Sequence, residues 1–269
     1  MKIVLDASKS AQANATAFFE KAKRLKQKIA GAREGLRLVE EKRALLDKKS
    51  VVEQKPKPLI RRKVDWYEKF HWCLTSNGLL IVGGRDAHSN EVLVKRHMEE
   101  KDLYFHADTH GAPHCLLKEG RLRAQEGDIR EAASFAGLYS SIWKKGLFSV
   151  KVYSVYPEQV SKKAPAGESL GKGAFMIYGQ RHWHTPLLRM GMGVHPSSHG
   201  PRMMGGPLTA VQTHAHHIME ILPGEKSKSE VAKSYLAFLR KKWDGILPPL
   251  DDIIRTLPNG LLSMRPVEN

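Results

Sequence analysis

A heptad pattern near the start of the chain constrains its fold more than any other sequence feature. Apolar residues recur there at alternating steps of four and three positions, at Ala11, Ala15, Phe18, Ala22, Leu25, Ile29, Ala32, Leu36 and Val39. A seam of this period favours a left-handed coiled coil. One helix cannot bury its own seam, so we expect a partner helix from another copy, another chain or a later part of this chain. The pattern predicts a coiled-coil helix over residues 1–52, with Asp6 or Ser8 as its N-cap.

This first segment also holds most of the positive charge. Residues 1–63 contain 18 Lys or Arg and 7 Asp or Glu, a net charge of +11, against +16 for the whole chain. The side chains of Lys21, Arg24 and Lys28 form a basic face beside the seam. Such an excess favours a polyanionic partner, because each neutralised phosphate releases counterions. A solvated basic surface is the alternative.

Two prolines among basic residues at 53–63 predict an extended linker, after which the pattern changes. Apolar runs predict strands at 70–75, 79–82, 102–107, 114–118, 148–155 and 175–178, and helices at 90–100 and 129–144. Asn77-Gly78 is a hairpin signal between the first two strands. We expect an α+β domain over 64–190, a mixed sheet with flanking helices preceded by the long N-terminal coiled-coil helix.

Residues 191–269 are expected to form a C-terminal extension packed on this domain. Their composition predicts a loop at 194–206 and helices at 227–243 and 250–257. The chain has two cysteines, too few for a disulfide framework, and no run of about 18 apolar residues. Its first residues lack the apolar stretch of a signal peptide. We therefore expect a cytoplasmic protein without a membrane partner.

The first candidate binding cluster surrounds the end of the predicted hairpin. A Gly83-Gly84 pair lets backbone N–H groups approach a phosphate, and Arg85 beside it can hold the same phosphate in a bidentate grip. A tight turn in which Arg85 pairs with a nearby carboxylate is the alternative. The candidate RNA-binding residues of this cluster are Lys69, Arg85, Asp86 and Asn90.

The second cluster alternates along a predicted strand and its end. His106, Asp108 and His110 face one side of an extended segment, which allows a metal site or a general-base pair. No second set of ligands follows at a matching spacing, so a structural His–Asp contact is favoured and no metal is expected. We retain His106 and Asp108 as candidate RNA contacts.

The third cluster is a polar loop rich in hydrogen-bond donors. Its amide, hydroxyl and ammonium groups suit phosphate oxygens and 2′-hydroxyls. It lacks the spacing of a Walker A loop, and a solvated loop is the alternative. The candidate RNA-binding residues here are Gln159, Ser161, Lys162, Lys163 and Lys172.

Several short sequence strings in residues 64–180 occur in the same order as in one known family. They are Trp66-Tyr-Glu-Lys-Phe, Gly83-Gly-Arg-Asp-Ala, His106-Ala-Asp, Pro157-Glu-Gln-Val-Ser-Lys and Gly173-Ala-Phe-Met-Ile. Together they look like the NFACT-R RNA-binding domain of ribosome-quality-control factors of the NEMF and RqcH type, also known as fibronectin-binding protein-like.

The resemblance implies a non-catalytic RNA-binding module without cofactor that acts on the large ribosomal subunit or tRNA after translation stalls. The family's NFACT-N domain has no counterpart in this sequence, and its coiled coil is shortened to one helix. We therefore expect a fragment, one half of a split protein or a shortened paralogue, for which tRNA selection is not carried over. The coiled coil is expected to self-associate or to bind an NFACT-N-type partner. A protein-interaction scaffold and a metal-assisted hydrolase that uses His106, Asp108 and His110 remain the alternative functions.

Overall fold

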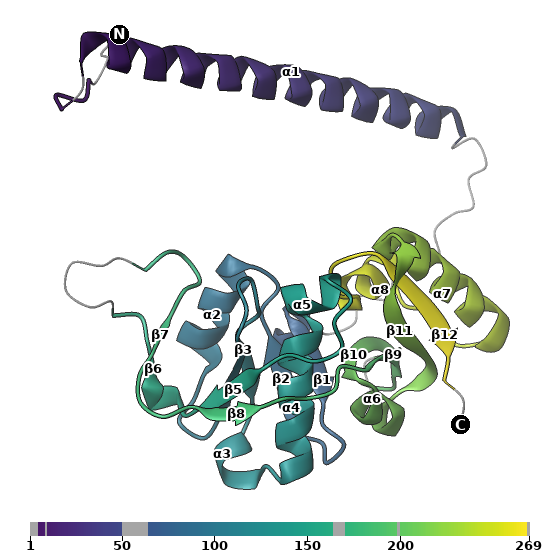
Figure 1. Ribbon diagram of the computed structural model, residues 1–269. Helices are drawn as coiled ribbons and strands as arrows, with labels where there is room; N and C mark the ends of the chain where they lie inside the picture. The colour runs from purple at the N-terminus through teal and green to yellow at the C-terminus, as the bar shows by residue number, and fades with distance from the viewer. Residues whose placement is uncertain (1–4, 9, 50–63, 164–169, 198–199, 268–269) are drawn as a thin grey trace. The chain divides into compact units, whose positions relative to one another are not determined.

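The computed structural model describes residues 5–8, 10–49, 64–163, 170–197 and 200–267 (Figure 1). The chain divides into two compact units, Met1–Arg61 and Arg62–Asn269. The predicted linker at 53–63 lies outside the described residues. Within the described ranges, the predicted α+β class with a long N-terminal helix is confirmed.

The first unit is dominated by one helix, α1 (Ala11–Lys49). Neither Asp6 nor Ser8 caps it, because the backbone N–H of Ala13 donates to the Ser10 hydroxyl at 3.2 Å. Asp6 instead closes the turn before the helix, where its backbone N–H donates to the Asn14 side-chain oxygen at 2.9 Å.

The apolar seam of α1 faces solvent. Phe18 is 42% exposed, Leu25 50% and Ile29 52%. A run of apolar side chains along a helix normally packs against another element. Within this unit, the described residues leave the seam uncovered.

Among its described residues, the second unit contains three antiparallel sheets. The largest has six strands, in the order β1 (His71–Leu74), β2 (Leu80–Gly83), β4 (Cys115–Leu117), β3 (Leu103–Ala107), β5 (Val152–Val155) and β8 (His182–His184). The next has the order β10 (Arg202–Pro207), β9 (Met190–His195), β11 (His216–Lys226) and β12 (Leu262–Pro266). The last pairs β6 (Val160–Ser161) with β7 (Met176–Ile177).

Short helices connect and flank these sheets. They are η1 (Trp66–Lys69), α2 (Ala87–His97), α3 (Gly120–Arg123), α4 (Glu126–Leu138), α5 (Ser141–Lys144), η2 (Pro157–Gln159), α6 (Leu208–His214), α7 (Lys228–Lys242) and α8 (Leu250–Thr256). None of the helices in the described ranges is long and apolar enough to cross a membrane.

Two helix boundaries differ from the sequence expectation because of capping side chains. The helix predicted from residue 90 begins at Ala87, where Asp86 accepts a hydrogen bond from the Ser89 backbone N–H at 2.7 Å. The helix predicted over 129–144 is divided. Ser140 interrupts it, donating its hydroxyl to the Gly137 carbonyl at 2.7 Å while accepting the Ile142 N–H at 3.3 Å.

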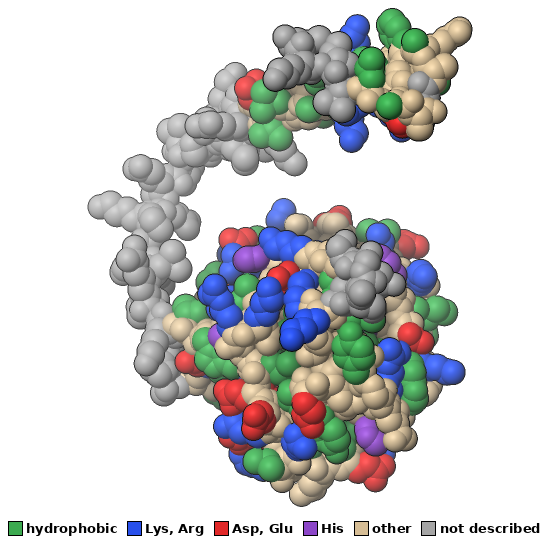
Figure 2. Space-filling model, turned by 90° about the vertical axis from the view of Figure 1, so that its left-hand side faces the viewer, with side chains coloured by type: hydrophobic (Ala, Val, Ile, Leu, Met, Phe, Trp, Pro, Cys, Tyr) green, Lys and Arg blue, Asp and Glu red, His purple; other side chains and the backbone are tan. Residues whose placement is uncertain are grey.

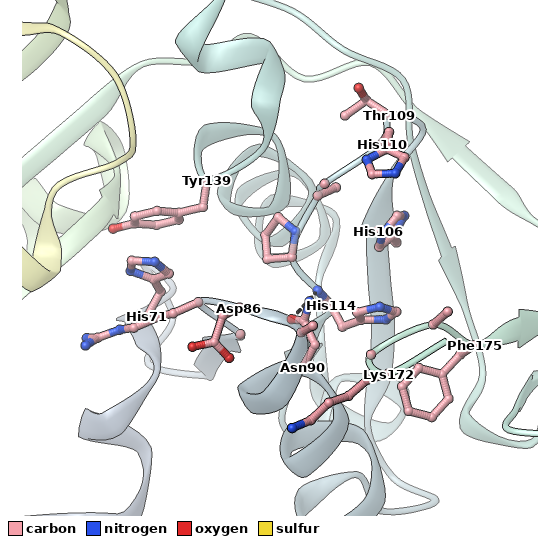
Figure 3. A pocket seen from close by; sticks show the side chains of 18 of the residues that line it. His71, Asp86, Asn90, His106, Thr109, His110, His114, Tyr139, Lys172 and Phe175 are labelled. Carbon is pink, nitrogen blue, oxygen red and sulfur yellow. Dashed lines mark hydrogen bonds between the residues drawn. The ribbon is translucent and has the colours of Figure 1, made fainter. Parts of the chain in front are cut away.

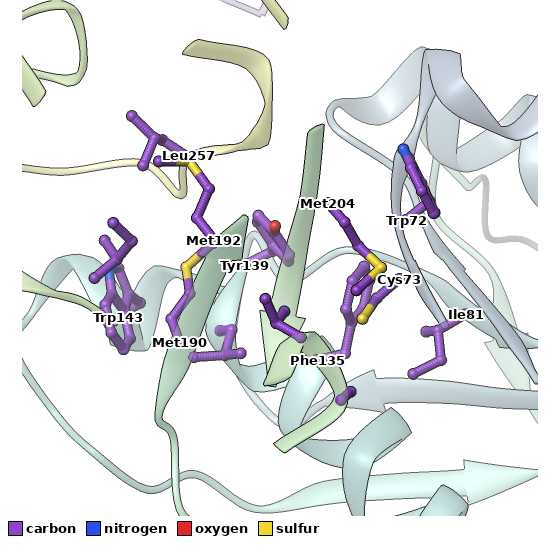
Figure 4. Packing of buried hydrophobic residues seen from close by; sticks show 14 of the residues in the cluster. Trp72, Cys73, Ile81, Phe135, Tyr139, Trp143, Met190, Met192, Met204 and Leu257 are labelled. Atoms are coloured by element: carbon purple, nitrogen blue, oxygen red, sulfur yellow. The ribbon is translucent and has the colours of Figure 1, made fainter. Parts of the chain in front are cut away.

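The main core lies around α4, which contacts the six-stranded sheet and also β10 of the four-stranded sheet. Figure 4 shows Phe135 and Tyr139 of α4 packed among residues of both sheets, including Met204 of β10 and Cys73 of β1. Phe135 and Met204 are fully buried. Residues beyond 190 therefore share one core with the residues before them.

The loop predicted at 194–206 is shorter in the structure, since β9 runs to His195 and β10 begins at Arg202. Glycines in these strands made the segment look irregular, but they permit close packing. A Cβ atom at Gly206 would lie 2.7 Å from the Cys73 sulfur. Strand glycines often mark such an approach of neighbouring groups.

Candidate nucleic-acid interface

A cavity of about 510 Å³ opens beside the N-terminus of α2. The six-stranded sheet supplies one wall through β3 and the residues before β4, and the loop that carries Lys172 and Phe175 supplies another. Figure 3 shows His71 and Tyr139 on one side of this cavity and His106, His110 and Phe175 on the other. This volume lies in the range of small-molecule sites and is large enough for a nucleotide.

The N-terminus of α2 is held against the sheet by Asn90. The backbone N–H of His114 donates to the Asn90 side-chain oxygen at 3.1 Å, and the Gly84 N–H donates to the His114 carbonyl at 3.0 Å. A Cβ atom at Gly84 would collide with the Asn90 side chain. The absence of a side chain at Gly84 therefore permits this close approach between strand end and helix.

The rings of His106, His114, Tyr153 and Phe175 line one half of the cavity. The ring centroids of His106 and His114 are 4.9 Å apart, those of His114 and Phe175 5.2 Å, and those of His106 and Tyr153 5.8 Å. The Tyr104 hydroxyl hydrogen-bonds the His114 ring and fixes its orientation. Such faces suit stacking with a planar base.

The two histidines of this half are neutral at physiological pH. Burial, with a smaller contribution from the nearby His106, lowers the pKa of His114 to about 3. Burial also lowers the pKa of His106 to about 4. These rings therefore contribute stacking surface and neutral hydrogen-bonding groups, whereas positive charge comes from arginine and lysine.

The other half combines a stacked pair with a cation. The rings of His71 and Tyr139 stack with centroids 3.9 Å apart, and the Tyr139 hydroxyl donates to the Thr256 carbonyl at 2.9 Å. The Arg85 guanidinium donates to the Phe70 carbonyl at 2.8 Å, and this hydrogen bond holds one edge of the guanidinium group in place.

The carboxylates near Arg85 have other structural roles. The Asp86 carboxylate caps α2 through the Ser89 N–H. Glu91 pairs with Lys95 at 2.6 Å and accepts the Gly173 N–H at 3.0 Å. Among the described residues, neither Asp86 nor Glu91 forms a salt bridge with Arg85.

The structure brings some predicted site residues into this cavity and leaves others outside. Those that line it are Arg85, Asp86, Asn90, His106 and Lys172. Those outside its lining are Lys69, Asp108, Gln159, Ser161, Lys162 and Lys163. The basic-face residues Lys21, Arg24 and Lys28 are exposed on α1, in the other unit.

Two of the outside residues support the cavity wall. The Lys162 ammonium donates to the carbonyls of Gly171 at 2.8 Å and Ala174 at 3.0 Å, which holds the loop of Lys172 in place. The Gln159 amide donates to the Tyr178 carbonyl at 2.8 Å, at the end of the same loop. Their contacts are structural within this unit, and Lys163 and Lys69 are exposed.

Sequence reasoning also missed residues from distant segments that line the cavity, among them His71, His114, Tyr139 and Asn259. They come from β1, the segment before β4, the end of α4 and the segment after α8. The alternation of His71 with buried neighbours in β1 was a usable signal, but no local pattern links these distant positions. Among the described residues, no group of three or more His, Cys, Asp or Glu is arranged to hold a metal.

Residues 69–179 match the family model described as "NFACT protein RNA binding domain". This segment is an NFACT-R domain. Its matched range includes the cavity residues from His71 to Phe175, whereas Asn259 lies outside it.

Known relatives agree with this assignment. The archaeal Rqc2 homolog aRqcH of Methanocaldococcus jannaschii is 35% identical over 206 residues, which cover 76% of this chain and 30% of that protein. The ribosome quality control complex subunit NEMF of Homo sapiens is 42% identical over 130 residues, or 48% of this chain and 12% of that protein. The chain thus spans less than a third of these relatives.

One solved structure is also similar, the C-terminal part of the fibronectin/fibrinogen-binding protein from Streptococcus suis. It aligns with a TM-score of 0.39 at 18% identity and covers 66% of this chain and 76% of that chain. At this distance the likeness supports no functional argument.

Charged side chains are spread unevenly over one face of the second unit. Figure 2 shows several Lys and Arg side chains close together on this face, with Asp and Glu side chains among and below them. A basic area is the usual electrostatic footprint of a nucleic-acid site.

Proposed function

We propose that this chain binds ribosome-associated RNA, either tRNA or large-subunit rRNA, through the NFACT-R cavity and its basic surroundings. In this proposal it acts in the cytoplasm, in the rescue or quality control of stalled translation, as a binding module without catalysis or cofactor. The description of the matched family and the names of its relatives support the ribosomal context.

The observation that carries the proposal is the combination of stacking faces and cations in one cavity. His106, His114 and Phe175 offer uncharged ring faces, and Arg85 and Lys172 border the same space. Sequence-tolerant RNA binding uses this pairing of aromatic platforms with a cationic backbone track. The formal charge of +16 adds a general attraction to phosphates.

A salt titration with the full chain tests the proposal. The affinity for a tRNA mixture is measured by fluorescence anisotropy between about 50 and 200 mM salt, where counterion release makes binding steep. Lys172→Ala should weaken binding and lower the salt slope by about one, as expected for one lost phosphate contact. Lys172 is exposed, so the change should leave the fold intact.

The matched control is Lys241→Ala, a similarly exposed lysine at the C-terminal end of α7 and outside the cavity lining. The control should leave both affinity and slope within error of the unmodified chain. Equal effects of the two substitutions would show that only overall charge matters, and an absence of measurable binding would end the proposal.

A protein-interaction scaffold is the second candidate function, and the exposed seam of α1 favours it. Phe18, Leu25 and Ile29 expose apolar surface that a second α1 helix or an NFACT-N-type partner would bury. Partner binding driven by this seam should be insensitive to salt, unlike RNA binding, and calorimetry distinguishes the two.

A further inference from the structure

Two buried nitrogen atoms beside the cavity lack a hydrogen-bond partner. In the described part of the chain, the Arg85 Nε and His71 Nδ1 atoms are both buried and unpaired. Both residues line the cavity. A buried polar atom without a partner costs free energy unless a ligand or water satisfies it. Arg85 and His71 therefore bring unsatisfied hydrogen-bonding capacity to this half of the cavity.

A lysine from the C-terminal region lies in the electrostatic neighbourhood of both residues. Lys228, the first residue of α7, reaches the Asn259 side-chain oxygen at 3.4 Å, and Asn259 lines the cavity. Partial burial lowers the pKa of Lys228, and the neighbouring Arg85 lowers it further. An anion that binds between Arg85 and Lys228 would offset the repulsion between these two cations.

Three cations, Arg85, Lys228 and Arg255, outnumber the two carboxylates that act on Arg85. These carboxylates belong to Asp252 and Asp86 and oppose the effect of the Arg255 guanidinium on Arg85. The Asp86 carboxylate is already engaged as the cap of α2. The His71 ring adds no charge, because burial, Arg85 and Lys228 lower its pKa well below the usual value.

We propose that Arg85, Lys228, His71 and Asn259 form a phosphate subsite, in which a nucleotide phosphate binds while its base enters the half lined by His114 and Phe175. The subsite joins the NFACT-R domain to the C-terminal region, since Lys228 and Asn259 lie beyond the matched residues 69–179. It rests on the proposed RNA-binding function and names the element of RNA that the cavity takes. Figure 3 shows His71 and Tyr139 across the cavity from His114 and Phe175, as this division requires.

The test compares cytidine 5′-monophosphate with cytidine on the full chain, by titration followed through NMR chemical shifts. The unmodified chain should bind the nucleotide about tenfold or more tightly than the nucleoside, the gain expected of one charge-assisted phosphate contact. Lys228→Gln should bring the two affinities together, and Lys228→Arg should restore most of the difference. Lys241→Ala is the control on the same helix and should keep the full preference.

Inorganic phosphate separates the anion from the base. It should compete with the nucleotide for the unmodified chain and fail to perturb the Lys228→Gln variant. Equal binding of nucleotide and nucleoside, or a preference that survives Lys228→Gln in a folded chain, overturns the subsite. If tRNA still binds in that case, the proposed function stands without it. If the nucleotide preference holds but tRNA does not bind, the subsite stands and the RNA-binding function falls.

Discussion

Replacement of His114 by asparagine should make the globular unit less sensitive to acid. His114 is 6% exposed, and burial lowers its pKa to about 3 from an ordinary value near 6.5. Between these values the unfolded chain takes up a proton that the folded chain does not bind, so stability falls as pH falls. Asparagine keeps an oxygen where the ring nitrogen bonds Tyr104, but it does not titrate.

The magnitude follows from proton linkage. Between pH 7.5 and 5.5, a histidine with an unfolded pKa near 6.5 and a folded pKa far below the window contributes a loss of about 1.4 kcal/mol in unfolding free energy. The unmodified chain should lose at least this amount, and His106, whose pKa is also lowered, adds to the loss. The His114→Asn variant should lose about 1.4 kcal/mol less than the unmodified chain over the same window.

Urea unfolding followed by tryptophan fluorescence measures this difference. All five tryptophans lie within Arg62–Asn269, so the signal reports the unit that contains His114. The comparison is between pH-induced losses, so a constant destabilisation by the substitution cancels. Equal losses in the two proteins, within about 0.3 kcal/mol, would refute the neutral buried state of His114 and with it the uncharged stacking surface.

Three further predictions concern the cavity and the helix. Phe175→Ala should weaken RNA binding by about 1–3 kcal/mol, the value of one stacked base, in an anisotropy titration, and an unchanged affinity would remove Phe175 from the interface. Gly84→Ala should cost about 1–3 kcal/mol of stability through overpacking against Asn90, measured by urea unfolding, with a neutral effect contradicting the close approach. Replacement of Leu25 and Ile29 by serine should abolish concentration-dependent association of the chain in sedimentation velocity, and association that persists would exclude the seam as its cause.

Local patterns predicted the parts of the fold that local interactions determine. The heptad spacing predicted α1 because a helix of this length needs no distant contact to be recognised, and the helix predicted at 227–243 is present as α7. The Asn77-Gly78 pair predicted the hairpin, because its turn needs a residue that adopts a positive φ readily. Gly78 has a φ of 85°. The helix boundaries at Asp86 and Ser140 differ from the prediction because side-chain caps set them, and the spacing of apolar residues does not reveal these caps.

The C-terminal strands were harder to predict, because long-range packing sets their structure. Glycines such as Gly205 and Gly206 read as loop residues in isolation, yet they lie in β10 against Tyr139 and Cys73. The same limit applies to the cavity. Arg85 and Lys172 were recognised from their own neighbours, whereas Asn259 enters only through the folding of the whole second unit.

Photo-crosslinking of bound tRNA to the full chain, followed by mass spectrometry of the attached peptides, tests the central claim most directly. The proposed function predicts crosslinks at the rings that face the cavity, foremost Phe175 and Tyr139, together with the segment around Lys172. Crosslinks confined to α1, with none in residues 69–179, would contradict it and would leave the basic helix as the RNA-binding element.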